Sequence, residues 1–135
     1  VMTPQHGFSN YLLDRYLVAA ELLRIPPVLV VNKADLLDDA SLAALKNQLA
    51  VYESVGYPVV LSSVLVENGL TDLTRTLKGH RGVLVGPSGV GKSSLIKALG
   101  STESIRVGEV TEKGGGKHTT TASRLYHLDG GGALI

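Results

Sequence analysis

The run GPSGVGKS, at residues 86–93, contains the side chains whose types and spacing most clearly support chemistry. It has the pattern G-x-x-x-x-G-K-S/T, in which glycines let backbone N–H groups converge on phosphate oxygens at the start of a helix. We expect Lys92 to reach the β- and γ-phosphates of a nucleotide and the Ser93 hydroxyl to bind Mg²⁺. The motif does not choose between ATP and GTP, and its alternative interpretation is a glycine-rich turn before a helix. The predicted phosphate-binding residues are Gly86, Pro87, Ser88, Gly89, Val90, Gly91, Lys92, Ser93 and Ser94.

A second motif, Asn32-Lys33-Ala34-Asp35, has the N-K-x-D pattern that recognises guanine. The Asp35 carboxylate can accept hydrogen bonds from N1–H and from the exocyclic amine of guanine, a donor pair that adenine lacks. Asn32 can bond the base edge and tether neighbouring loops, while the Lys33 stem lies along the ring. Four residues can match by chance, and Asp35 could simply begin a helix. Together with the phosphate loop, however, the motif predicts a site for GTP and GDP.

The order of the two motifs is the reverse of that in an ordinary GTPase, whose phosphate loop opens the domain. NKAD stands first here, which predicts a circularly permuted domain. Permutation is tolerated because the site needs loops that cluster at the carboxyl ends of strands, not a particular chain order. Residues 78–81 would form the short link between the two former ends.

Weaker candidates complete the predicted site. Ser62 and Ser63 follow a predicted strand, so a backbone N–H there can reach guanine O6, although a serine pair in this position is usually only a loop or cap. Thr119 or Thr120, in the run HTTT, is expected to bind Mg²⁺ within a first switch that orders with GTP. The alternative is a polar lead-in to the next strand. His118 is a candidate catalytic group, with an exposed loop histidine as the alternative.

Alternating helix and strand patterns position these motifs. Apolar residues at helical spacing predict helices over 9–24, 38–55, 70–77 and 93–99, with Ser9 capping the first and Asp38 or Asp39 beginning the second. Aliphatic runs predict buried strands over 28–31, 58–61 and 82–85, and residues 1–4 resemble the tail of another strand.

The last part of the chain predicts a hairpin, with strands over 124–128 and 133–135 joined by a turn at 129–132. The fold class that follows is α/β, a mostly parallel sheet with helices on both faces and one antiparallel hairpin. At 135 residues the chain is expected to form one domain.

Composition excludes several classes of protein. The absence of Cys excludes a disulfide framework and a Cys-based zinc site within these residues. No apolar run approaches membrane-spanning length and no signal peptide is recognisable, so we expect a cytoplasmic protein without a membrane partner. Residues 1–74 carry four basic and eight acidic side chains, whereas residues 75–135 carry nine and four. The basic second half suits contact with polyphosphate or RNA, although so modest an excess is more often a solvated surface.

Four runs, LDRYLVA at 13–19, NKAD, GPSGVGKSSL and GKHTTTASRLYHL, resemble the ribosome small-subunit-dependent GTPase A family, RsgA. The resemblance covers almost the whole chain. It implies a permuted G domain whose GTP hydrolysis is stimulated by the small ribosomal subunit, late in the maturation of that subunit and in contact with its rRNA. It also implies an oligonucleotide-binding barrel before residues 1–135 and a zinc-binding domain after them. We expect the protein to be a monomer.

The resemblance further implies that these residues are an incomplete G domain. The family's Asp-Ser/Thr-Pro-Gly motif, whose Asp contacts Mg²⁺ through water, would begin after Ile135. The leading prediction is a Mg²⁺-dependent GTPase that acts as a switch, with little hydrolysis by this fragment alone. One alternative is a non-catalytic module whose binding depends on GTP or GDP, and a more distant one is a P-loop small-molecule kinase.

Overall fold

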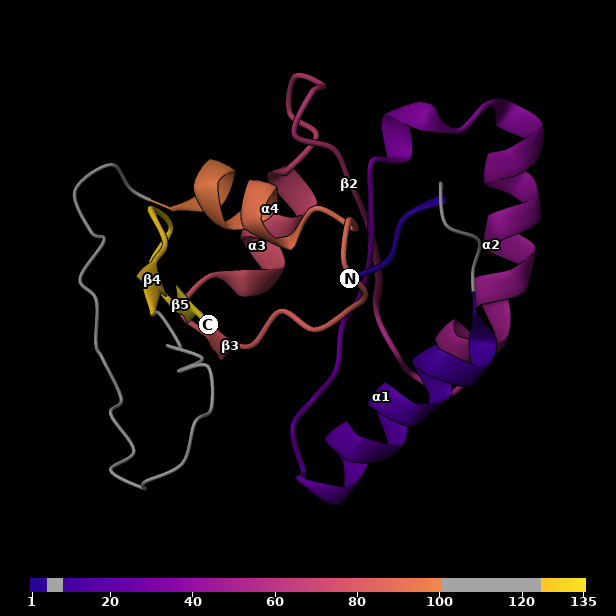
Figure 1. Ribbon diagram of the computed structural model, residues 1–135, viewed down its shortest axis with the longest axis horizontal. Coiled ribbons are helices and arrows are strands. Elements are labelled where there is room, and N and C mark those ends of the chain that lie inside the picture. The colour runs from indigo at the N-terminus through magenta and orange to yellow at the C-terminus, as the bar shows by residue number, and fades with distance from the viewer. Residues whose placement is uncertain (5–8, 101–124) are drawn as a thin grey trace, which may run out of the picture.

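A computed structural model describes residues 1–4, 9–100 and 125–135 of the chain (Figure 1). The helices are α1 (Asn10–Leu22), α2 (Asp39–Ser54), α3 (Thr71–Leu77) and α4 (Lys92–Leu99), with a short 3-10 helix, η2 (Ala34–Leu36), after the first strand. The strands are β1 (Leu29–Asn32), β2 (Val59–Ser62), β3 (Arg81–Gly82), β4 (Tyr126–His127) and β5 (Ala133–Leu134). Helices and strands alternate along the chain as the apolar patterns predict.

Side-chain caps begin the two long helices. The Ser9 side chain accepts from the Leu12 N–H at 3.4 Å, and the Asp38 carboxylate accepts from the Ser41 N–H at 2.8 Å. Both bonds satisfy backbone donors that the first turn of a helix leaves without an internal partner. The predicted cap at Ser9 is therefore confirmed, and the choice between Asp38 and Asp39 falls on Asp38.

Parallel pairing dominates the sheets. β1 and β2 are parallel, with Asn32 opposite Ser62, and β3 and β5 are parallel as well. β4 and β5 form the predicted antiparallel hairpin. Met2 makes a parallel bridge to Val31, so the first residues of the chain lie beside β1, as their strand-like pattern indicates.

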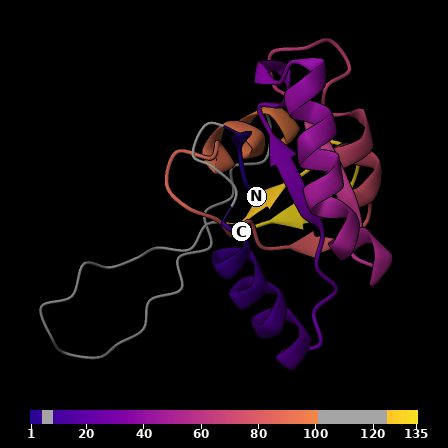
Figure 2. The ribbon, with the colours of Figure 1, turned by 90° about the vertical axis from the view of Figure 1, so that its right-hand side faces the viewer.

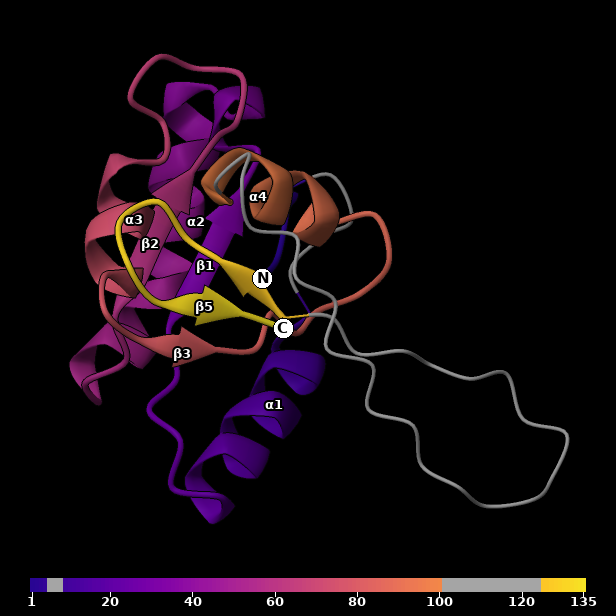
Figure 3. The same ribbon diagram turned by 90° about the vertical axis from the view of Figure 1, so that its left-hand side faces the viewer.

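Helices cover both faces of the β1–β2 pair, and the alternation of side chains in β1 shows how. Val30 packs in one buried cluster with Leu73 of α3 and Leu95 of α4. Val31, the next residue, packs in a second cluster with Leu49 of α2. Successive strand side chains point to opposite faces, so each face needs its own helical layer. Figure 2, viewed from the α1–α2 side, and Figure 3, viewed from the α3–α4 side, show the two layers.

The third predicted strand is shorter than expected. Only Arg81–Gly82 is strand, whereas the aliphatic pattern predicts a strand over 82–85. Beyond Gly82, the Leu84 N–H donates to the Ile135 carbonyl oxygen at 3.0 Å, but Val83 and Val85 are exposed. The prediction was wrong here because an apolar run indicates only a tendency to form a strand. A strand also needs a neighbouring strand that forms hydrogen bonds with it along its whole length.

Candidate nucleotide-binding site

The predicted base-reading residues lie where two neighbouring parallel strands end. Asn32 is the last residue of β1 and faces Ser62, the last residue of β2. Both side chains are buried, as is Ser63, which follows directly. Open α/β sheets bind ligands outside the carboxyl ends of their strands, and these residues occupy that position.

Asn32 joins the base-reading motif to the phosphate loop. Its Nδ2 donates to the Val90 carbonyl oxygen at 2.9 Å across 58 positions of sequence. Gly91 permits this approach, because a β-carbon at residue 91 would overlap Asn32 Nδ2 and because its backbone has φ 94°. The two motifs, far apart and reversed in the chain, therefore form one continuous site.

Lys33 makes a second link between the motifs. Its backbone is left-handed, with φ 60° and ψ 39°, a conformation that is uncommon for residues other than glycine. From there its Nζ donates to the Gly89 carbonyl oxygen at 3.1 Å. The lysine side chain thus spans the space between NKAD and the phosphate loop.

The phosphate loop is closed by its own lysine. Lys92 Nζ donates to the carbonyl oxygens of Gly86 at 2.8 Å and Pro87 at 2.7 Å. Lys92 is also the first residue of α4, so the loop leads into a helix N-terminus, which favours anions. Ser93 and Ser94 lie in the first turn with exposed side chains. The loop therefore leads directly into a helix, as the phosphate-binding motif requires, but the strand before it ends at Gly82, three residues short of the loop.

Ser63 has a different place from the one that the sequence indicates. Its hydroxyl donates to Asp35 Oδ1 at 2.5 Å, and its own N–H donates to the Gly69 carbonyl oxygen at 3.0 Å. The Ser63 N–H is therefore engaged within the loop, and the expected contact of a backbone N–H with guanine O6 stays a prediction. Across residues 62–65 of the described structure, the amide with no acceptor is that of Val64, because Ser62 pairs with β1 and Leu65 N–H donates to Ser63 Oγ.

The sequence does not single out Val64 as a candidate. Its side chain is apolar and partly exposed, and nothing in the residue type indicates a ligand contact. The signal lies in the hydrogen bonds of its neighbours, which only the folded loop reveals.

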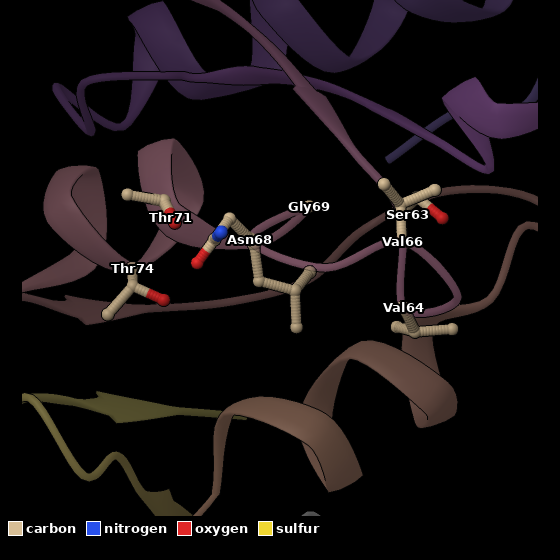
Figure 4. A pocket seen from close by; sticks show the side chains of 8 residues that line it. Ser63, Val64, Val66, Asn68, Gly69, Thr71 and Thr74 are labelled. Atoms are coloured by element: carbon tan, nitrogen blue, oxygen red, sulfur yellow. The ribbon is translucent and has the colours of Figure 1, made fainter.

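We call the place where the Ser63 hydroxyl bonds Asp35 the base-reading corner. A cavity of about 360 Å³ lies next to this corner (Figure 4). It shares Ser63 with the base-reading group but includes no residue of the phosphate loop. Its walls come from the loop after β2 and from the start of α3: Ser63, Val64, Val66, Asn68, Gly69, Leu70, Thr71 and Thr74. The cavity therefore adjoins the base-reading corner through Ser63 and is separate from the phosphate loop.

The predicted switch residues His118, Thr119 and Thr120 lie outside the described residues. In the part of the chain that is described, no group of three or more His, Cys, Asp and Glu side chains could hold a metal ion. The exposed Ser93 hydroxyl beside the phosphate loop fits Mg²⁺ instead, because this ion is usually held by one or two protein groups together with substrate phosphates. None of the described helices has the length and hydropathy of a membrane span.

The family model described as "RsgA GTPase" matches residues 1–135. The chain belongs to the RsgA GTPase family. It is 50% identical over 136 residues to "Small ribosomal subunit biogenesis GTPase RsgA" of Pseudomonas syringae pv. tomato, covering 100% of this chain and 40% of the relative. It is 49% identical over 128 residues to "Small ribosomal subunit biogenesis GTPase RsgA 1" of Vibrio vulnificus, covering 94% of this chain and 36% of the relative. The chain thus spans about two fifths of the length of these RsgA proteins.

Solved structures agree with this RsgA assignment. YjeQ from Thermotoga maritima superposes with a TM-score of 0.75 at 34% identity, over 99% of this chain and 44% of that one. YloQ, described as a circularly permuted GTPase, superposes with a TM-score of 0.67 at 30% identity, over 98% of this chain and 42% of that one. The predicted α/β fold with circular permutation is therefore confirmed.

Proposed function

We propose that this RsgA-family chain is the nucleotide-binding part of a longer protein that binds GTP and GDP with Mg²⁺ and hydrolyses GTP. The observation that carries the proposal is the hydrogen bond from Asn32 to the Val90 carbonyl oxygen. It holds a motif suited to guanine against a motif suited to phosphates, which supports the proposal that one nucleotide contacts both.

Guanine recognition is assigned to three groups at one corner. Asp35 accepts from the N1–H and the exocyclic amine of the base, and the Ser63 hydroxyl holds the carboxylate in place. The Val64 N–H would donate to O6, because the amides of Ser63 and Leu65 on either side of it already have acceptors. A site that pairs hydrogen-bonding groups in this way rejects a base that lacks the matching donors by a large factor.

Phosphate binding is assigned to the loop at 86–94 and, above all, to Lys92. On binding, Lys92 Nζ would leave the carbonyl oxygens of Gly86 and Pro87 and contact the β- and γ-phosphates. Ser93 and either Thr119 or Thr120 would hold Mg²⁺, which neutralises charge that develops on the transferring phosphoryl group. His118 remains a candidate for a catalytic role.

The role of the whole protein rests on its relatives. Their printed names assign them to biogenesis of the small ribosomal subunit, which supports the same role here. We extend the proposal to a cytoplasmic monomer that contacts rRNA, with an oligonucleotide-binding barrel before this chain, an Asp-Ser/Thr-Pro-Gly motif directly after Ile135, and a zinc-binding domain beyond it.

Single-turnover hydrolysis of radiolabelled GTP by the full-length protein tests the proposal. We expect slow release of phosphate from the protein alone and a marked acceleration by purified small ribosomal subunits. The matched control is GTP with large subunits. Tight GTP binding with no phosphate release under either condition would instead favour a non-catalytic module, and tighter binding of ATP than of GTP would favour a kinase.

A further inference from the structure

We infer that Gly69 is a positioning residue for guanine recognition, which holds the Asp35 carboxylate in place through Ser63. The inference rests on the proposed guanine-binding role of Asp35. Gly69 itself is remote from both motifs in the sequence and lies just before α3.

Hydrogen bonds connect the three residues in a line. The Gly69 carbonyl oxygen accepts from the Ser63 N–H at 3.0 Å, which fixes the backbone of Ser63. The Ser63 hydroxyl accepts from the Leu65 N–H at 3.1 Å and donates to Asp35 Oδ1 at 2.5 Å. With its amide and its hydroxyl both engaged, Ser63 has a single orientation and presents one oxygen of Asp35 at a defined place.

This series of hydrogen bonds can form only because residue 69 lacks a side chain. A β-carbon on Gly69 would overlap the Ser63 carbonyl oxygen and lie 2.9 Å from the Val66 carbonyl oxygen. Both neighbours are backbone atoms, so no rotamer change can relieve the overlap. The Gly69 N–H also donates to the Val66 carbonyl oxygen at 3.0 Å, which holds the loop folded over Ser63 (Figure 4). Any larger residue must therefore displace Ser63.

Gly130, which lies near Thr74 of the cavity wall, provides a matched control. A β-carbon there would meet Thr74 Cγ2 at 3.6 Å, which is ordinary van der Waals contact. Gly69 and Gly130 are both absent from the residues with positive φ, so alanine is compatible with the backbone at both sites. The two Gly→Ala variants thus differ in the overlap with Ser63 and not in dihedral strain.

The test compares GDP with IDP, whose base lacks the exocyclic amine, by calorimetric titration of the full-length protein. Wild type is expected to prefer GDP, because both bonds to Asp35 form only with guanine. Gly69→Ala and Ser63→Ala should each lower the GDP-over-IDP preference, by about fivefold and about tenfold. Gly130→Ala should keep most of it. If Gly69 acts through Ser63, the double variant Gly69→Ala/Ser63→Ala should lose little more than Ser63→Ala alone.

A wild-type preference for GDP that survives Gly69→Ala in a folded protein would overturn the inference and leave the proposed function intact. Equal affinity of wild type for GDP and IDP would instead contradict the guanine assignment itself. Hydrogen exchange of the wild type covers the case in which Gly69→Ala does not fold. The Ser63 amide should gain more protection with GDP than with IDP, and equal protection would also overturn the inference.

Discussion

The phosphate loop and the base-reading corner are built in opposite ways. The loop at 86–92 is held in part by its own residues, since Lys92 bonds the Gly86 and Pro87 carbonyl oxygens, six and five positions away. The base-reading corner joins segments that are distant in sequence, with Asp35 and Ser63 separated by 28 positions and Asn32 and Val90 by 58. The loop therefore has local bonds of its own besides the distant ones from Asn32 and Lys33, whereas the corner is formed by distant segments.

This difference has a consequence for circular permutation. The phosphate loop and its helix move as one unit wherever they stand in the chain. The corner requires β1 and β2 to stay side by side in register, which their parallel pairing provides, and the loop after β2 to hold Ser63. Reversing the order of the motifs therefore leaves both parts of the site intact.

Removal of the loop's charge should have the largest effect. Lys92→Ala in the full-length protein should weaken GTP binding by about two orders of magnitude and abolish hydrolysis, because it deletes the cation that faces the phosphates. Titration with a fluorescent GTP analogue measures this loss. Lys97→Ala, in the same helix, is the matched control, and a loss as large there would show that general charge and not the loop determines affinity.

A change at the corner should alter base preference before it alters phosphate binding. Asp35→Asn should weaken GDP by about thirtyfold and improve XDP relative to GDP, because the amide can donate where xanthine presents a carbonyl oxygen. Competition between GDP and XDP for one fluorescent probe gives the ratio. Unchanged GDP affinity would contradict the assignment of Asp35 to the base.

The Asn32–Val90 hydrogen bond, which links the two regions, should have a smaller effect on nucleotide affinity than a change in either region. Asn32→Ala leaves the Val90 carbonyl oxygen without its buried donor, which should cost about 1–3 kcal/mol of folding stability. GDP and GTP affinity should fall together by about tenfold, since the loop and the corner lose their alignment. Urea unfolding and calorimetry of the same samples measure both losses. A variant that loses stability but binds GDP as wild type does would show that this hydrogen bond stabilises the fold and does not contribute to nucleotide binding.

A cap remote from both regions should affect stability alone. The N–H and the hydroxyl of Ser41 lower the pKa of Asp38 below its ordinary value by stabilising the carboxylate. The folded state therefore gains stability above the ordinary carboxyl pKa and loses it as pH falls toward the lowered pKa. Asp38→Ala should lower Tm slightly at pH 7, by less at pH 3, with GDP affinity unchanged. An equal deficit at both pH values would argue against the charged cap.

Much of the site's content could be predicted from the sequence. The phosphate loop follows from fixed glycine and lysine positions, and NKAD follows from its place after a buried strand. The capped helices are also local features, because Ser9 and Asp38 bond amides three residues away. The strand predicted over 82–85 failed because its extent depends on β5, about 50 positions later in the chain.

The sequence by itself determined the alternation of helices and strands, the two motifs and their reversed order, because each depends on residue types within a few positions. The tertiary structure decided how the corner works. It directed the Ser63 N–H to Gly69 and the Ser63 hydroxyl to Asp35. Those outcomes arise from hydrogen bonds between separate segments, whose geometry exists only once the strands have paired and the loop after β2 has closed.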